Sequence, residues 1–224
     1  MTTVIFDLDG TLADTSADLI AAANACFEGL GHGARLDPKE DKLTAFHGGR
    51  AMLRLGFSRL EGGPDEAMVT QEYPKFLDHY ARNIDRFTKL YPGCKAALQR
   101  LKDAGHVLGV CTNKPEGLAE ALLERLGVRA QFSSLVGADT TAHSKPHSLP
   151  YLESVQRAGG SPDTSVLLGD TETDVKTARA AGVPVVLVAF GPEGDAVARL
   201  NPDALLEHYD RLDAVLDGLA SRQI

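Results

Sequence analysis

The sequence contains few of the residues that mark thiolate-metal, disulfide-rich or membrane proteins. Its 224 residues include no tryptophan, only three cysteines and three methionines, and 6% aromatic residues. Cys26, Cys94 and Cys111 cannot all pair, and no Cys-x-x-Cys or Cys/His spacing indicates a zinc site. No run reaches the ~18 apolar residues of a membrane helix, and the N-terminus lacks a basic region followed by an apolar signal run. We therefore expect a cytoplasmic protein without a membrane partner.

The chain also has fewer positively than negatively charged residues. The chain has 23 Lys and Arg against 31 Asp and Glu, a formal net charge of -8. Non-specific binding to nucleic acid depends on Lys and Arg at phosphates, so we expect no nucleic-acid partner. A small phosphorylated metabolite remains possible, because it responds to the field inside one cleft rather than to the average charge. The 43% of hydrophobic residues is typical of a globular protein with a substantial core.

Short apolar runs alternate with longer helical patterns along much of the chain. Continuous apolar runs of this length are typical of strands that are buried on both faces of a parallel sheet. The alternation predicts a doubly wound α/β fold with right-handed crossovers. We expect strands at 3–6, 106–111, 134–137, 165–168 and 183–188, and helices at about 92–104, 115–126 and 171–181, the last two followed by Gly127 and Gly182.

Residues 15–86 interrupt this alternation. They carry helical periodicity at 17–30, 50–60 and 65–82 and contain no convincing strand. We therefore predict an all-helical cap domain, 15–86, inserted after the first strand of a core domain formed by 1–14 and 87–224. The cap is expected above the carboxyl ends of the strands, with hinges near 14–16 and 87–90.

Oxygen-bearing side chains follow several of the predicted strands. Ligands of open α/β sheets bind beyond the carboxyl ends of the strands, where Asp7, Thr112, Asn113 and Asp170 would converge. Asp9 shares a side of the extended chain with Asp7, because residues i and i+2 point the same way.

Asp174 lies four residues after Asp170, on the same face of the following helix. A single aspartate at a strand end commonly caps a helix, but capping alone accounts poorly for the whole set. Carboxylates this close stay ionised only near a cation, and clustered hard oxygens suit Mg²⁺. Lys145, followed by Pro146, can reach the same rim and bind phosphate, although in isolation it could be an ordinary surface lysine.

These residues form a pattern that resembles the haloacid dehalogenase superfamily of phosphohydrolases, and within it the phosphoglycolate phosphatase group. The resemblance covers essentially the whole chain and implies a Rossmann-like core with a helical cap. The first and last of its four motifs are the most specific. In this chain the motifs are Asp7–Thr15, Thr112–Asn113, Lys145–Pro146 and Gly169–Asp174.

The resemblance implies a role for each of these residues. Asp7 would be the nucleophile, ionised at neutral pH, and Asp9 the general acid and base. Mg²⁺ would be held by Asp7, the backbone carbonyl of Asp9 and Asp170, with Asp174 in the next layer. The phosphoryl group would be held by Thr112 and Lys145 and by the segments around Gly10, Thr11 and Asn113.

The predicted cap contains a loop that could select the substrate, His47-Gly48-Gly49-Arg50. Gly48 and Gly49 permit a tight turn, and Arg50 could bind the carboxylate of 2-phosphoglycolate or simply face solvent. His47, and likewise His143 and His147 beside the lysine motif, are expected to be polar loop residues rather than catalysts.

Other functions remain open at this stage. The alternatives within the superfamily are a nucleotide, sugar-phosphate or pyrophosphate phosphatase, β-phosphoglucomutase, and a phosphonate hydrolase using Lys39 or Lys42. A catalytically silent binding module is a further alternative, although such modules commonly lose an aspartate or the lysine. The dehalogenases lack the second aspartate, so Asp9 argues for phosphoryl chemistry. Either a monomer or a homodimer is compatible with the sequence.

Overall fold

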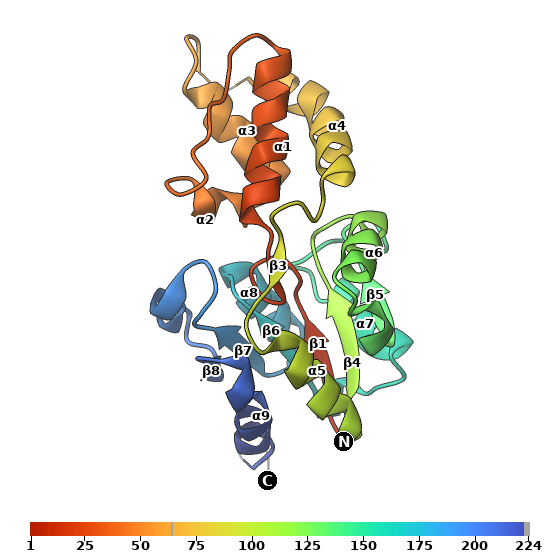
Figure 1. Ribbon diagram of the computed structural model, residues 1–224. Helices are drawn as coiled ribbons and strands as arrows, with labels where there is room; N and C mark the ends of the chain where they lie inside the picture. Colours follow the sequence, from red (N-terminus) through yellow and green to blue (C-terminus); the bar gives the residue numbers. More distant parts are fainter. Residues whose placement is uncertain (64, 222–224) are drawn as a thin grey trace. The chain divides into compact units, whose positions relative to one another are not determined.

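The computed structural model describes residues 1–63 and 65–221. The chain divides into two compact units, one formed by Met1–Ala13 and Leu90–Ile224 and the other by Asp14–Lys89. The domain limits expected from the sequence lie a few residues from these. The larger unit carries the six-stranded sheet and the smaller one is helical (Figure 1).

The larger unit contains a six-stranded, all-parallel sheet with the order β5-β4-β1-β6-β7-β8, which confirms the predicted fold class. All five predicted strands are present. The sixth, β8, was not predicted, because its three residues are only partly buried and lie between the charged residues Asp203 and Glu207. The strands are β1 (Thr3–Phe6), β4 (Val107–Cys111), β5 (Ser134–Val136), β6 (Ser165–Gly169), β7 (Val185–Val188) and β8 (Ala204–Leu206).

Helices cover both faces of this sheet (Figure 1). The three helices predicted for this unit are confirmed as α5, α6 and α8, and Gly182 ends α8 with a φ of 70°. Glycine suits that position because a positive φ is costly for residues with a Cβ atom. The helices are α5 (Cys94–Asp103), α6 (Glu116–Arg125), α7 (Leu149–Arg157), α8 (Glu172–Ala181) and α9 (Leu212–Ala220), with 3₁₀ turns at Arg129–Gln131, Pro162–Thr164, Gly194–Leu200 and Tyr209–Arg211.

Alternate strand residues serve the two faces. Ile5 and Leu167, neighbours on β1 and β6, pack with Tyr151 of α7 and Ala178 of α8 in one buried cluster. Phe6 points the other way and meets Phe132 edge to face, with ring centroids 6.0 Å apart. Because both faces are covered, the strands need the continuous apolar sequences from which they were predicted.

The smaller unit is helical, with α1 (Ser16–Gly29), α2 (Lys42–Ala45), α3 (Gly49–Ser58) and α4 (Glu66–Arg82). Its core brings Phe27 of α1 against Phe57 of α3, with ring centroids 5.1 Å apart. Gly56 permits this contact, since a Cβ there would lie 2.1 Å from the Phe27 ring. At the two chain crossings, β2 (Ala13–Asp14) pairs with β3 (Lys89–Leu90).

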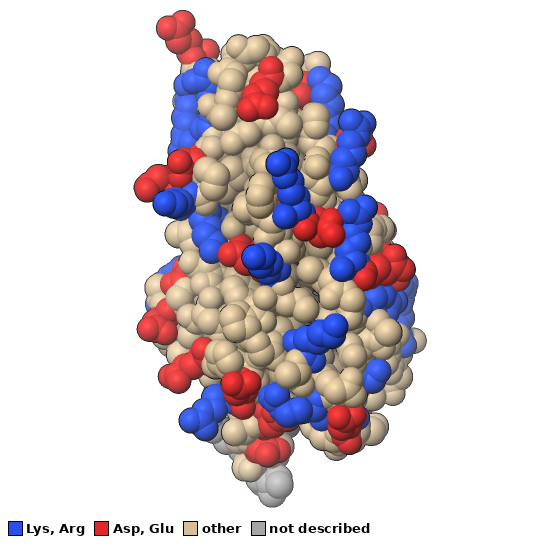
Figure 2. All heavy atoms as spheres, in the orientation of Figure 1, with Lys and Arg blue, Asp and Glu red and all other residues tan. Residues whose placement is uncertain are grey.

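Two features of the whole chain bear on its surroundings. No helix in residues 1–63 and 65–221 is long and apolar enough to span a bilayer. On the face drawn in Figure 2, Lys and Arg side chains are interspersed with Asp and Glu. Several charged side chains of the protein form ion pairs near the surface, such as Arg54 with Glu66 and Arg157 with Glu153.

Candidate active site

The register of the sheet places three strand ends side by side. Phe6 at the end of β1 lies opposite Val110 of β4 and Leu168 of β6. The next residue, Asp7, donates its N–H to the Leu168 carbonyl at 2.8 Å. The segments that follow β1, β4 and β6 therefore leave the sheet at the same edge, which is where parallel α/β sheets place their ligands.

Three buried carboxylates gather at this edge. One oxygen each of Asp7, Asp170 and Asp174 lies within 4.8 Å of the other two. Lys145, only 4% exposed, reaches them from the loop before α7. Its Nζ lies 2.6 Å from Asp174 Oδ1 and 3.0 Å from Asp7 Oδ1. Residues far apart in sequence thus form one charged cluster, as the motifs predicted.

Burial raises the pKa of the Asp7 carboxyl from 3.8 to about 6. The Lys145 ammonium opposes this increase, whereas the carboxylates of Asp174 and Asp9 add to it. Burial, with Asp174 and Asp7 nearby, likewise raises the pKa of Asp170 well above its usual range. Burial alone would lower the pKa of Lys145, but Asp174 and Asp7 raise it, so the lysine stays protonated. The cluster is therefore short of positive charge.

A second buried lysine lies at the same site. Lys114, with 4% of its side chain exposed, places its Nζ 3.0 Å from Asp9 Oδ1. Four carboxylates thus face two ammonium groups, which leaves two negative charges when all are ionised. One divalent cation would neutralise that excess.

The available oxygens fit such a cation. Asp170 Oδ2 is buried and accepts no hydrogen bond from any residue that the structure describes, and Asp7 Oδ1 is equally buried with the Lys145 ammonium 3.0 Å away. Gly10, with a φ of 85°, keeps the space beside Asp170 open, since a Cβ there would lie 2.2 Å from Asp170 Oδ2. A hard cation such as Mg²⁺ could bind both oxygens, and it would give Asp170 Oδ2 the partner that it lacks among the described residues.

Asp174 is differently engaged. Its Oδ1 accepts from Lys145, and its Oδ2 accepts from the N–H of Asp170 at 3.2 Å and from the N–H and hydroxyl of Thr171 at 3.1 and 2.8 Å. It therefore orients Lys145 and also caps the start of α8, so the capping interpretation of this aspartate applies alongside the catalytic one. With both oxygens occupied, Asp174 suits the outer position expected for it.

Two predicted phosphate-binding residues use their side chains to support neighbouring groups. Thr11 Oγ1 donates to Asp170 Oδ1 at 2.8 Å and so holds that carboxylate. Asn113 brackets the backbone of Lys145, donating from Nδ2 to its carbonyl and accepting its N–H at Oδ1, each at 3.0 Å. Thr112, buried at the end of β4, accepts the N–H of Lys114 at 3.1 Å. Because the side chains of Thr11 and Asn113 are engaged in these contacts, we expect their backbone N–H groups to make any contact with phosphate.

The remaining predicted binding residues, Gly49 and Arg50, belong to the helical unit. Gly49 begins α3, and a Cβ there would lie 2.3 Å from the Phe76 ring. The Arg50 guanidinium lies over the Tyr73 ring, 4.3 Å from its centroid. The side chain is exposed and held by a cation–π contact, so it presents a positive charge on a rigid support.

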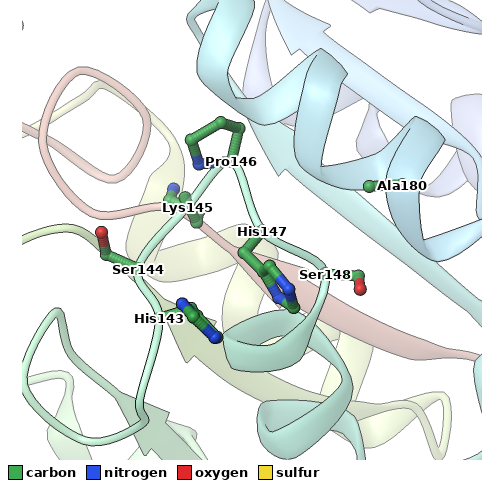
Figure 3. Close-up of a pocket in the computed structure, with 7 residues that line it drawn as sticks. All are labelled: His143, Ser144, Lys145, Pro146, His147, Ser148 and Ala180. Carbon is green, nitrogen blue, oxygen red and sulfur yellow. The ribbon is translucent and has the colours of Figure 1, made fainter.

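The loop that carries Lys145 also lines a cavity of about 540 Å³, together with Ala180 of α8. Figure 3 shows His143 and His147 side by side at this cavity, with ring centroids 4.4 Å apart. His147 Nδ1 accepts the N–H of Leu149 at 3.0 Å, so in the neutral ring the proton sits on Nε2. That tautomer does not favour a metal bridge between the rings, and both histidines are exposed loop residues.

Lys114 is the site residue that sequence reasoning missed. It directly follows Thr112 and Asn113, and its charge and position were visible in the sequence. A lysine after a strand is usually a solvated surface residue, and only its burial against Asp9 distinguishes it.

Several known proteins resemble this chain. Residues 4–188 match the model of the family described as haloacid dehalogenase-like hydrolase. A phosphoglycolate phosphatase of Mesorhizobium japonicum is 37% identical over 213 residues, which cover 95% of this chain and 93% of that protein. One from Xanthomonas campestris pv. campestris is 41% identical over 192 residues, covering 84% and 83%. A crystal structure from Haemophilus somnus, described as a predicted phosphoglycolate phosphatase, shares the fold with a TM-score of 0.85 at 24% identity, over 96% of this chain and 97% of that one.

Proposed function

The chain belongs to the haloacid dehalogenase-like hydrolases, and we propose that it is a Mg²⁺-dependent phosphatase that forms an aspartyl-phosphate on Asp7. The observation that carries the proposal is a pair of buried carboxylate oxygens: Asp7 Oδ1, next to the Lys145 ammonium, and Asp170 Oδ2, which accepts no hydrogen bond from the described residues. A nucleophilic carboxylate and a cation site require such oxygens to be available together.

Asp7, the backbone carbonyl of Asp9 and Asp170 would hold the cation, and Asp174 would support it through Lys145. Bound Mg²⁺ supplies positive charge that offsets the repulsion between the carboxylate and the phosphate and stabilises charge in the transition state. Thr112, Lys145 and the backbone amides around Gly10 and Asn113 would hold the phosphoryl oxygens.

The reaction then takes two steps on this chain's residues. An Asp7 oxygen attacks phosphorus while Asp9 gives a proton to the departing ester oxygen, which leaves as an alcohol. Asp9 next takes a proton from water, and that water attacks the phosphorus of the aspartyl-phosphate. The Asp7 carboxylate leaves and inorganic phosphate is released. Lys145, held by Asp174 and Asn113, stays protonated and fixed throughout.

We propose 2-phosphoglycolate as the preferred substrate. Support comes from the two relatives above, which are named phosphoglycolate phosphatases and whose similarity covers more than four-fifths of this chain. Arg50, rigidly supported on Tyr73, is the candidate for the substrate carboxylate. Nucleotides, sugar phosphates and pyrophosphate are the competing substrates, and β-phosphoglucomutase activity is the competing reaction.

The test is phosphate release from a substrate panel led by 2-phosphoglycolate, with and without Mg²⁺, for the wild type and Asp7→Asn. We expect release to require Mg²⁺ and to fall at least about 10³-fold in the variant, because the nucleophile is lost. Asp103→Asn, an exposed aspartate on α5, is the matched control and should keep wild-type rates. Product analysis with glucose 1-phosphate separates hydrolysis from mutase activity. Folded wild type that hydrolyses no phosphate ester would refute the proposal.

A further inference from the structure

We propose that Lys114 is a positioning residue that holds the Asp9 carboxylate in place for proton transfer. The inference rests on the proposed function, because it assigns Asp9 the proton-transfer role. It adds a residue outside the four motifs by which the site was found. Its basis is the 3.0 Å contact between Lys114 Nζ and Asp9 Oδ1, within the unit that carries the carboxylates.

The side chain of Asp9 is less buried than those of its neighbours. Asp9 follows β1 and forms an isolated β-bridge with Ala13, and 19% of its side chain is exposed, against 12% for Asp7 and 0% for Asp174. A proton donor must stay within hydrogen-bond reach of the departing oxygen, and small displacements cost much of the rate. An ammonium group fixed beside one carboxylate oxygen restricts the rotation of the whole group.

Lys114 is itself held firmly. Its N–H donates to Thr112 Oγ1 at 3.1 Å, and its carbonyl accepts the N–H of Ala138 at 3.0 Å. Gly137 makes the second contact possible, because a Cβ there would lie 2.8 Å from the Lys114 carbonyl oxygen and 2.4 Å from the Glu116 nitrogen. The segments after β4 and β5 thus interlock around the backbone of this lysine, so that it can act as a fixed support.

The two lysines of the site divide the carboxylates between them. Lys145 contacts Asp7 and Asp174, and Lys114 contacts Asp9. Burying a lysine is costly unless it gains a partner, so the burial of Lys114 indicates a defined ionic contact rather than a solvated side chain. A role confined to stability would leave the chemistry of Asp9 unaffected, which gives a way to tell the two roles apart.

The distinguishing measurement uses the leaving group. An alkyl phosphate such as 2-phosphoglycolate releases a strongly basic oxygen that needs the proton from Asp9. 4-Nitrophenyl phosphate releases a phenolate that is stable without it. The ratio kcat/KM reports the steps through departure of this group, so water attack in the second step does not enter. Loss of Asp9 positioning should therefore slow the alkyl ester much more than the aryl ester.

The experiment compares kcat/KM of the wild type and Lys114→Met for both esters at saturating Mg²⁺. We expect a loss of about 10- to 100-fold for 2-phosphoglycolate and less than about 3-fold for 4-nitrophenyl phosphate, within the range of general acid catalysis. Lys114→Arg, which keeps the cation, should recover part of the loss. Lys102→Met, an exposed lysine on α5, is the control and should match the wild type with both esters.

A double variant tests whether Lys114 acts through Asp9. In an Asp9→Asn background, Lys114→Met should cause little further loss with 2-phosphoglycolate, because coupled residues are not additive. Equal losses with both esters, or full additivity of the two changes, would overturn the proposal. If Lys114→Met does not fold, the same ratio of losses for the two esters is measured with Lys114→Arg and Lys114→Gln. A larger loss for 2-phosphoglycolate than for 4-nitrophenyl phosphate in Lys114→Gln supports the proposal, and equal losses overturn it. A wild type inactive on every phosphate ester would instead refute the proposed function.

Discussion

At the scale of single residues, the site depends on charges that are buried without complete neutralisation. Asp170 keeps one buried oxygen without a hydrogen bond from the described residues, and the buried Asp7 Oδ1 has the Lys145 ammonium 3.0 Å away. Burial raises the pKa of both carboxyls, to about 6 for Asp7. Burying these carboxylates lowers the stability of the metal-free fold, and a bound cation would offset this loss of stability.

This arrangement predicts a pH-dependent stabilisation by Mg²⁺. The pKa of Asp7 is about 6 in the fold and 3.8 unperturbed, so the metal-free folded chain binds this proton more tightly than the unfolded chain. The contribution of Asp7 to the unfolding free energy of the metal-free protein therefore falls as pH rises from about 4 to about 6, and it stays lower above that range. Mg²⁺ needs the ionised carboxylates, so it should stabilise the protein above pH 6 and little below pH 5.

Thermal melts with and without Mg²⁺ at pH 5 and pH 7.5 measure this effect. We expect a rise in Tm of a few degrees at pH 7.5 and almost none at pH 5. Asp170→Asn should remove the rise at pH 7.5. An equal rise at both pH values would show that Mg²⁺ binds elsewhere than at the Asp7 and Asp170 carboxylates.

At the scale of elements, the loops after neighbouring strands support one another. Asn113, after β4, forms two hydrogen bonds of 3.0 Å with the backbone of Lys145, which lies between β5 and α7. Thr11, after β1, holds Asp170 after β6. Lys145 and Asp170 are thus each held by a residue that follows another strand.

The Asn113 contact can be tested separately. Asn113→Ala removes both hydrogen bonds and should lower the free energy of unfolding by about 1–3 kcal/mol, because the Lys145 backbone loses its partners. We expect kcat for 2-phosphoglycolate to fall about 10-fold as Lys145 becomes less well placed. Urea unfolding and steady-state kinetics measure the two effects.

Asn83→Ala provides the comparison for this change. Asn83 is an exposed asparagine with one 3.3 Å hydrogen bond to the His79 carbonyl. That variant should change neither quantity appreciably. Wild-type kcat in a well-folded Asn113→Ala protein would contradict the positioning of Lys145 by Asn113.

At the scale of the whole molecule, segments from opposite ends of the chain meet behind the carboxylates. Tyr209, fully buried, donates its hydroxyl to the Thr11 carbonyl at 2.8 Å across 198 positions of sequence. Its ring packs on Phe190, with centroids 5.1 Å apart, and Phe190 packs at the same distance on Tyr91. Tyr209 therefore supports the segment whose Thr11 hydroxyl orients Asp170.

Tyr209→Phe should therefore weaken Mg²⁺ binding. Loss of the hydroxyl should cost about 0.5–1.5 kcal/mol in unfolding free energy and several-fold in Mg²⁺ affinity, since Thr11 orients Asp170 less firmly. Tyr151→Phe is the matched variant, because the buried Tyr151 hydroxyl bonds Ser165 Oγ at 2.7 Å, at the start of β6. It should lose similar stability but keep its Mg²⁺ affinity. Titration calorimetry with Mg²⁺ at pH 7.5 distinguishes them, and equal affinities would contradict the prediction.

The sequence by itself determined the fold class, the five predicted strands and the family. Burial on both faces leaves continuous apolar runs such as 183–188, and the chain order of a parallel sheet brings Asp7 and Asp170 to one edge. β8 and α9 were not predicted. β8 is short, only partly buried and flanked by charged residues, and without a predicted strand before it the α9 segment did not continue the alternation of strands and helices.

Only the tertiary structure decided which partner each polar side chain takes. Periodicity indicates that a residue is buried, but not what it touches. Lys114 reads as an ordinary surface lysine until the pairing of β1 with β4 brings it to Asp9. The sequence predicts Asn113 and Thr11 as phosphate binders, but the structure shows their side chains hydrogen-bonded to Lys145 and Asp170. These contacts depend on strand register and loop geometry, which arise from long-range packing and leave no local signal in the chain.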